Sequence, residues 1–206
     1  MKKGFTRQNF SKKNLVGFTL LELLIVIGIL AILSTTMILV INPAEILKKA
    51  RDSQRISDLN TLKSAIAYYI TSTSSPNIGL STKTYSSNVT GASCAGRATA
   101  SDDITLEVNG SGWIPINFSE LTGGSPIGSL PQDPNPSTTV DGNPSRYYVY
   151  LPNASDYTFT LVANMESATY SAQEGTDGGN ITTLYEVGTA MLLSTTSANC
   201  FPNPGY

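Results

Sequence analysis

The sequence predicts an α+β protein in which a long N-terminal helix, first transmembrane and then amphipathic, packs against a small antiparallel β-sheet. Three observations predict this class: an apolar run over residues 18–41, helical periodicity over residues 44–70, and β-branched and aromatic segments separated by turn residues nearer the C-terminus. With 206 residues, the chain has room for a leader, one long helix and one globular domain of ordinary size.

The run from Phe18 to Ile41 contains one charged residue, Glu22. Its 24 residues would form a helix about 36 Å long, enough to span a hydrocarbon core of about 30 Å. A secretory signal peptide has a similar order, but its apolar region covers only about 7 to 15 residues. Five basic residues and no acid precede the run: Lys2, Lys3, Arg7, Lys12 and Lys13. The positive-inside rule then predicts a single-pass membrane protein with residues 1–17 in the cytoplasm and the remaining chain on the other side.

The acid within this run has two interpretations. A carboxylate in an apolar membrane segment is costly unless it is paired. In the first interpretation Glu22 lies near the membrane interface and reaches water by extending its side chain, which needs no partner. In the second it pairs with a cation supplied by another molecule, which makes it more than part of an anchor.

The residues around Glu22 carry a family resemblance. A short basic leader ending in Gly17, the segment Phe18-Thr19-Leu20-Leu21-Glu22 and an unbroken apolar helix resemble the class III signal of type IV prepilins and type II secretion pseudopilins. The resemblance implies the pilin fold, cleavage of leader 1–17 between Gly17 and Phe18 by a prepilin peptidase, and N-methylation of the new Phe18 amine. Glu22 would then be the assembly residue, neutralised by the Phe18 amine of a neighbouring subunit in a low-dielectric core.

The function that this resemblance implies is that of a structural subunit of a type IV pilus or pseudopilus filament. The implied partners are a prepilin peptidase/methyltransferase, other copies of the chain and related pilins, an assembly platform in the inner membrane, and membrane lipid. The chain would reside in the inner membrane with its head outside the cytoplasm and then enter a filament. Two alternatives stay open: a major pseudopilin of a type II secretion system, and a membrane-anchored binding or adhesion module.

Residues 42–72 are expected to form an amphipathic helix, the second half of a long helical stalk that begins with the apolar run. Asn42-Pro43 ends the apolar run, and proline removes a backbone donor and disfavours helix for the residue before it, so we expect a kink or break there. The charged residues of this segment are expected to be solvated or to pair with neighbouring stalks. An apolar stripe recurs at steps of three and four residues and should pack under a sheet; it comprises Leu47, Ala50, Leu59, Leu62, Ile66, Tyr69 and Ile70.

Residues 73–206 predict a loop-rich β head. No periodicity is evident over residues 71–103, which are expected to form a connection rich in loops. Strand candidates follow at residues 104–108, 113–118, 146–151, 157–165 and 184–187, with a hairpin turn at 152–156. Within the head, Leu130-Pro131-Gln132-Asp133-Pro134, followed by Tyr147-Tyr148, is similar to a segment of major pseudopilins, although prolines around a polar turn are also common in ordinary loops.

Two cysteines and one acidic loop are candidate sites in the head. Cys94 and Cys200 lie in the exported part, where a disulfide is permitted; free thiols are expected only where the compartment is not oxidising. Glu174, Asp177 and Asn180 place oxygen donors on a Gly-rich loop, as calcium requires, and major pseudopilins carry calcium in a comparable late loop. The spacing differs from an EF-hand, and an ordinary solvated loop has the same composition. Calcium is therefore the one candidate cofactor.

Composition argues against catalysis and nucleic-acid binding. The chain has no histidine, which excludes Ser-His, Cys-His and histidine-metal arrangements, and it has no P-loop or Gly-x-Gly-x-x-Gly motif. From Phe18 onward 8 basic residues stand against 15 acidic ones, so phosphate neutralisation is not expected. We therefore expect neither an enzyme nor a nucleic-acid-binding protein.

Overall fold

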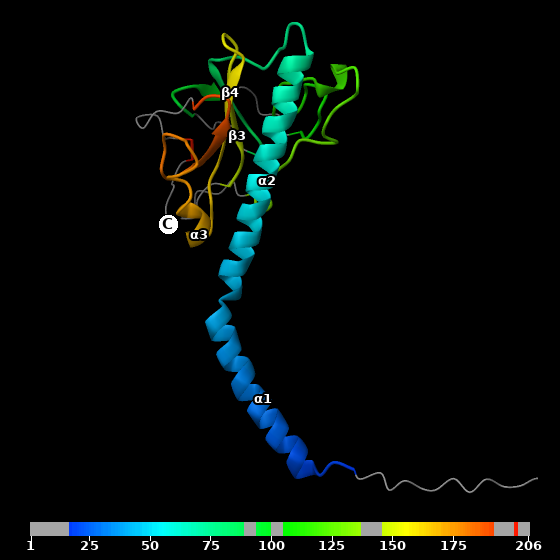
Figure 1. Cartoon of the computed structure of the whole chain (residues 1–206), viewed down its shortest axis with the longest axis vertical. Coiled ribbons are helices and arrows are strands. Elements are labelled where there is room, and N and C mark those ends of the chain that lie inside the picture. The colour runs from blue at the N-terminus through cyan, green and yellow to red at the C-terminus, as the bar shows by residue number, and fades with distance from the viewer. Residues whose placement is uncertain (1–16, 89–93, 100–104, 137–145, 192–199, 202–206) are drawn as a thin grey trace, which may run out of the picture. The chain divides into compact units, whose positions relative to one another are not determined.

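The computed structural model describes residues 17–88, 94–99, 105–136, 146–191 and 200–201 (Figure 1). The chain forms two compact units, Met1–Pro43 and Ala44–Tyr206. The second helix of the predicted stalk belongs to the same unit as the β head, because the two share a core.

The first unit contains helix α1, Leu20–Ile41. Thr19 is its N-cap and forms a capping box with Glu22, in which each side chain binds the other residue's backbone N–H. The stretch Leu20–Met37 is apolar and none of it is buried. In length and composition α1 is thus able to cross a membrane, as the sequence predicts.

The predicted break falls at Asn42. This residue adopts a left-handed conformation, with φ at 45° and ψ at 76°, and so ends α1. The second helix, α2, runs over Pro43–Ser72. Pro43 occupies its first position, where a missing N–H costs no helical hydrogen bond and the ring presets φ.

One side of α2 packs on the sheet of the second unit. Leu59, Leu62, Ile66 and Tyr69 are buried in the main core, as the stripe predicts. Leu47 belongs to the same stripe but is 59% exposed, so the stripe is covered only in its later part. The prediction that the charges of α2 are solvated is wrong for Asp52 and Arg55, which are fully buried.

The second unit holds a five-stranded sheet of order β2-β1-β3-β4-β5. Neighbours from β1 to β5 pair antiparallel, while the short β2 pairs parallel with β1. An antiparallel sheet packed on a helix is the α+β arrangement that the sequence predicts. The strands are β1 Lys83–Ser86, β2 Ala98–Thr99, β3 Val149–Asn153, β4 Thr158–Ala163 and β5 Tyr185–Gly188; a short helix α3, Ala168–Ser171, and a 3₁₀ turn η1, Phe118–Glu120, complete the elements.

Both faces of the central strands are covered. Because side chains alternate along a strand, Tyr150 of β3 enters the main core beside α2, whereas Val149 and Leu151 enter a second, smaller core on the other face. Consecutive Tyr148 and Tyr147 divide in the same way. The sheet therefore separates a helix-covered side from a side that other segments must cover.

The strand predictions for the C-terminal half are confirmed, with shifted ends: the candidates at 146–151, 157–165 and 184–187 correspond to β3, β4 and β5. The predicted hairpin turn is tighter than 152–156, because β3 continues to Asn153 and β4 begins at Thr158. β1 and β2 lie in the region where no periodicity was evident. Strands this short leave too few residues for alternation to be recognised.

The strand candidates at 104–108 and 113–118 are wrong for the described residues. Ile104 lies outside them, Phe118 begins η1, and the remaining positions form irregular loop with one isolated bridge, between Asn109 and Asn117. Pro115 lacks the N–H that a strand interior requires. Trp113 is nonetheless buried and donates from Nε1 to the Pro131 carbonyl at 3.1 Å, so this loop supplies core without forming a ladder.

Candidate functional site

The predicted cleavage site lies just ahead of α1. Gly17 and Phe18 precede the helix, and Phe18 is 92% exposed. A Cβ placed on Gly17 would meet nothing within 4 Å. The bond between these residues is thus open to another protein in the isolated chain.

Glu22 has a partner within its own chain, and the partner is Thr19. Glu22 Oε2 accepts hydrogen bonds from the Thr19 backbone N at 2.9 Å and from Thr19 Oγ1 at 2.8 Å. Thr19 Oγ1 accepts in return from the Glu22 backbone N at 3.2 Å. The Thr-x-x-Glu spacing is a capping-box signature that could have been read from the sequence. The two bonds to the carboxylate both use Oε2, and the capping box holds the acid in the first turn, where the helix dipole favours a negative charge.

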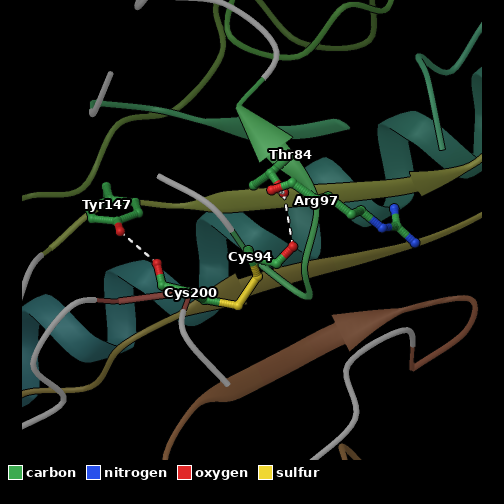
Figure 2. The surroundings of a disulfide bond; sticks show 5 residues. All are labelled: Thr84, Cys94, Arg97, Tyr147 and Cys200. Carbon is green, nitrogen blue, oxygen red and sulfur yellow. Dashed lines mark hydrogen bonds between the residues drawn. A yellow bond between two sulfur atoms is a disulfide. The ribbon is translucent and has the colours of Figure 1, made fainter. Parts of the chain in front are cut away.

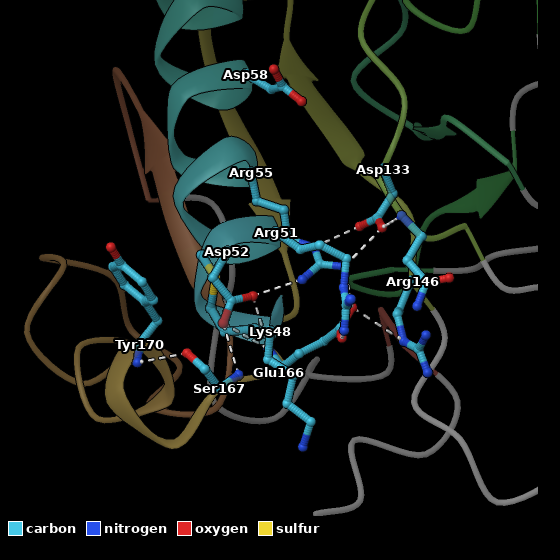
Figure 3. A network of polar contacts seen from close by, with 12 residues as sticks. Lys48, Arg51, Asp52, Arg55, Asp58, Asp133, Arg146, Glu166, Ser167 and Tyr170 are labelled. Atoms are coloured by element: carbon cyan, nitrogen blue, oxygen red, sulfur yellow. Dashed lines mark hydrogen bonds and ion pairs between the residues drawn. The ribbon is translucent and has the colours of Figure 1, made fainter. Parts of the chain in front are cut away.

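A buried charge cluster fixes the early turns of α2 to the head (Figure 3). At its centre Arg55 donates from Nε and Nη2 to the two Asp133 carboxylate oxygens, at 2.7 and 2.8 Å. Its Nη1 donates to Asp52 at 2.6 Å, and Nη2 also reaches Glu166 at 2.5 Å. The i,i+3 spacing of Asp52 and Arg55 is a sequence signal for such a pair. No local spacing in the sequence identifies Asp133 as a partner of Arg55, because the two residues are 78 positions apart.

Two further arginines complete the charge cluster. Arg51 donates to both carboxylate oxygens of Glu166, and Arg146 Nε lies 3.5 Å from Glu166 Oε1. Burial alone would raise the pKa of Glu166, but the hydrogen bonds from Arg51 and Arg55 outweigh it and hold that pKa below its usual value. The surrounding carboxylates likewise keep the Arg55 guanidinium protonated, because they raise its pKa despite burial. Glu166 and Arg55 therefore both favour their ionised forms inside the head.

Acids of α2 also bind backbone in the segment after β4. Asp52 accepts the N–H groups of Glu166 and Ser167, the latter at 2.7 Å. About two turns earlier in α2, Glu45 Oε1 accepts a hydrogen bond from the backbone N–H of Ala168 at 2.9 Å. These contacts join the early turns of α2 to residues 166–168 independently of the arginines.

The segment resembling major pseudopilins has a defined place in this arrangement. Leu130 is buried in the main core and Asp133 is the counter-ion of Arg55. Tyr148 donates its hydroxyl to Asp58 Oδ2 at 2.8 Å, and burial, followed by the Asp58 charge, raises the pKa of Tyr148. The segment thus contributes core and a buried ion pair rather than a solvated turn.

The predicted disulfide between Cys94 and Cys200 is present (Figure 2). It joins residues separated by 106 positions and lies fully buried in the smaller core. Tyr147 donates its hydroxyl to the Cys200 carbonyl at 2.6 Å, and Thr84 Oγ1 donates to the Cys94 carbonyl at 3.2 Å. The bond thereby holds Cys200 and Phe201 over the face of the sheet that α2 does not cover.

In the predicted calcium loop, the carboxylate oxygens of Glu174 and Asp177 accept hydrogen bonds from backbone N–H groups. Glu174 Oε1 accepts from the Met165 N–H at 3.1 Å, and Asp177 accepts from the N–H groups of Gly179 and Glu186, at 2.7 and 2.6 Å. Asn180 donates its own N–H to Glu186 Oε2 at 2.6 Å. The described residues contain no group of three His, Cys, Asp or Glu side chains that could hold a metal ion. Calcium binding at this loop stays a prediction.

Glu186 is a buried acid that the sequence reasoning missed. Its Oε2 accepts from the backbone N–H groups of Asn180 and Ile181, but its buried Oε1 has no hydrogen-bond partner among the residues that the structure describes. Burial is the main cause that raises its pKa. Glu186 lies in the four-residue strand β5. So short a strand shows no clear alternation, and no motif around Glu186 indicates that this acid is buried.

Together these features define an α+β chain with one N-terminal helix able to span a membrane and a disulfide-bonded head. No family model, curated protein or solved structure matches the chain.

Proposed function

We propose that this chain is a prepilin-like structural subunit of a membrane-derived filament, processed between Gly17 and Phe18 and assembled through α1. The observation that carries the proposal is the position of Glu22: a single acid in the first turn of an apolar helix, five residues after an exposed Gly17. An anchor needs no acid there, whereas a filament subunit uses one to neutralise the amine of another copy. In this arrangement the head lies outside the cytoplasm and residues 1–17 lie within it.

Geometry supports open-ended growth. The Phe18 amine of one copy and the Glu22 carboxylate of another are different groups, so their pairing is heterologous. Contacts of this kind close into a ring only for special rotations and otherwise propagate into a helical filament. The hydrogen bonds to Thr19 engage Oε2 of Glu22, and Oε1 is the oxygen we assign to the incoming amine.

The first test concerns processing. Full-length chain is expressed in membranes with and without a prepilin peptidase, and the N-terminus is identified by mass spectrometry. We expect a mature chain beginning with N-methylated Phe18 only when the peptidase is present. Gly17→Ala is the matched control, since it should slow cleavage and leave membrane insertion unchanged. Cleavage at another bond, or none, would refute this part of the proposal.

The second test separates a role in assembly from a role in capping. Glu22→Ala removes both the carboxylate and the capping box, whereas Thr19→Ala removes only the cap. We expect filaments, seen by electron microscopy of sheared cells, to be absent with Glu22→Ala and present with Thr19→Ala, while both variants are cleaved. Equal loss in the two variants would mean that Glu22 serves only its own helix. Normal filaments with Glu22→Ala would end the pairing proposal.

The class of filament is open between a type IV pilus and a secretion pseudopilus. The similarity of residues 130–134 to major pseudopilins favours the second. Deletion of the chain followed by parallel assays of twitching, DNA uptake and secreted protein distinguishes them. A membrane-anchored binding module would instead show no polymer and a surface phenotype.

A further inference from the structure

We infer that the first two turns of α2, residues 43–50, bind the headgroup layer of an anionic phospholipid membrane in the unassembled chain. The inference goes beyond the proposed filament and rests only on the membrane span of α1. These turns will be called the interfacial turns.

The interfacial turns present apolar side chains outward. Ile46 is 50% exposed and Leu47 59% exposed, and Ala50 is also exposed. Ile46 and Ala50 lie on the side of α2 away from the buried Arg55, and Leu47 lies beside them at the edge of the stripe that is buried further along the helix. A pair of large exposed aliphatic side chains next to a membrane span is a candidate for insertion at the boundary between headgroups and acyl chains.

Charge distinguishes the two sides of these turns. Glu45 is the one acid in the interfacial turns, and its carboxylate is directed to the Ala168 N–H within the head. Lys49 is exposed and forms no ion pair among the described residues. Lys48 lies 4.0 Å from Glu45 but extends away from the charge cluster (Figure 3). The outward surface is therefore apolar and cationic, which suits an anionic lipid surface.

The interfacial turns are close enough to the end of α1 to reach the headgroup layer at any angle of the chain at Asn42. The headgroup layer is about 5 to 7 Å thick on each side of a bilayer. Leu47 lies four residues beyond Pro43, or about 6 Å along α2 at 1.5 Å per residue. A chain that crosses the membrane through Ile41 thus holds Ile46 and Leu47 within or beside that layer.

A second copy of the chain is the competing occupant of the same surface. The lipid interpretation is favoured because the apolar pair directly follows the span and because the cations accompany it without an outward acid. In a filament the same surface would exchange lipid for protein, so the two occupants succeed each other. The test must therefore be done on separated copies.

The experiment uses full-length chain in vesicles at a low protein-to-lipid ratio. An environment-sensitive fluorophore is attached at Ala50→Cys or, as the matched position two turns further on, at Ser57→Cys. The native cysteines are bonded to each other, so a thiol reagent labels only the new one. Vesicles contain phosphatidylcholine alone, or phosphatidylcholine with one third phosphatidylglycerol.

We expect the label at position 50 to emit at shorter wavelength and more strongly in the anionic vesicles, and the label at 57 to change little. Replacing each lysine, by Lys48→Gln and Lys49→Gln, should weaken the preference for anionic vesicles by about fivefold. Lys63→Gln, on the same helix but nearer its other end, should leave the preference unchanged. Added salt should reduce the response of the unmodified chain.

Three results would overturn the inference. The label at position 50 could respond equally in both lipids, or the two labels could respond alike. The emission could instead follow protein density rather than lipid composition, which would assign the surface to a second copy. Alkaline extraction of the same vesicles reports the span separately, and filament formation plays no part in the readout, so a failed filament proposal leaves this test intact.

Discussion

The two long helices distribute their charges in opposite ways. α1 bears one charged residue, Glu22, and its side chains from Leu20 to Met37 are exposed in the isolated chain. α2 bears many charges, yet Asp52 and Arg55 are fully buried while Ile46 and Leu47 are exposed. The difference shows where each helix finds its partners: the buried charges of α2 are paired within the chain, whereas the apolar surface of α1 is left uncovered.

The largest expected effect comes from the disulfide, which belongs entirely to the α2 unit. Cys94→Ser with Cys200→Ser should lower the free energy of unfolding of the head by about 4 to 5 kcal/mol, because it releases a loop of more than 100 residues in the unfolded state. Urea denaturation followed by Trp113 fluorescence measures it. A midpoint equal to that of the oxidised parent would show that the cover of the smaller core holds without the bond.

The next effect tests the charge cluster. Arg55→Ala leaves Asp52, Asp133 and Glu166 without their central cation and should destabilise the head by about 3 to 5 kcal/mol. Lys63→Ala on the same helix is the control and should cost less than about 1 kcal/mol. Thermal unfolding by circular dichroism compares the two. Equal losses would mean that the cluster contributes nothing beyond ordinary helix packing.

A smaller effect of opposite sign is expected at Asp58. Burial is the main cause that raises the pKa of Asp58, so its ionised form weakens the fold at neutral pH. Asp58→Asn retains an acceptor for the Tyr148 hydroxyl and should stabilise the head slightly at pH 7, because solvent screens much of the cost of this half-exposed charge. This advantage should shrink as the pH falls through the raised pKa, because the parent carboxyl then protonates. An advantage that grows on acidification would contradict the assignment.

The smallest effect on stability is expected from Glu22. Glu22→Ala should leave the melting temperature of the head unchanged, since the residue contacts only Thr19 among the described residues. The same substitution is expected to abolish filaments. A head destabilised by Glu22→Ala would mean that the two units depend on each other, which would weaken the contrast between the helices.

Much of this architecture could be predicted from local patterns. The apolar run, Pro43 and the β-branched segments after Tyr147 each carry a periodicity or a turn signal, and α1, α2, β3, β4 and β5 follow from them. Spacing is likewise the basis for the processing segment proposed at Gly17 to Glu22. The disulfide was predictable because two cysteines allow only one pairing.

The remaining features depend on contacts between distant residues. In the sequence, Arg55 looks like one more solvated charge on α2. Its burial depends on Asp133 and Glu166, which only the fold brings next to it. Trp113 reads as part of a strand, whereas its loop is shaped by prolines and by backbone bonds such as that from the Trp113 N–H to the Thr105 carbonyl. In both cases tertiary packing decides what a local pattern leaves open.

The ring closed by Cys94 and Cys200 also sets an order of events in biogenesis. Before the bond forms, the segment from residue 94 to residue 200 can pass through a narrow channel as a single extended strand. Once it has formed, two strands must pass side by side, which a channel fitted to one strand does not admit. In the proposed topology, with the head outside the cytoplasm, threading across the membrane comes first and oxidation second, so a chain oxidised too early should stall with its ring on the side where it was made.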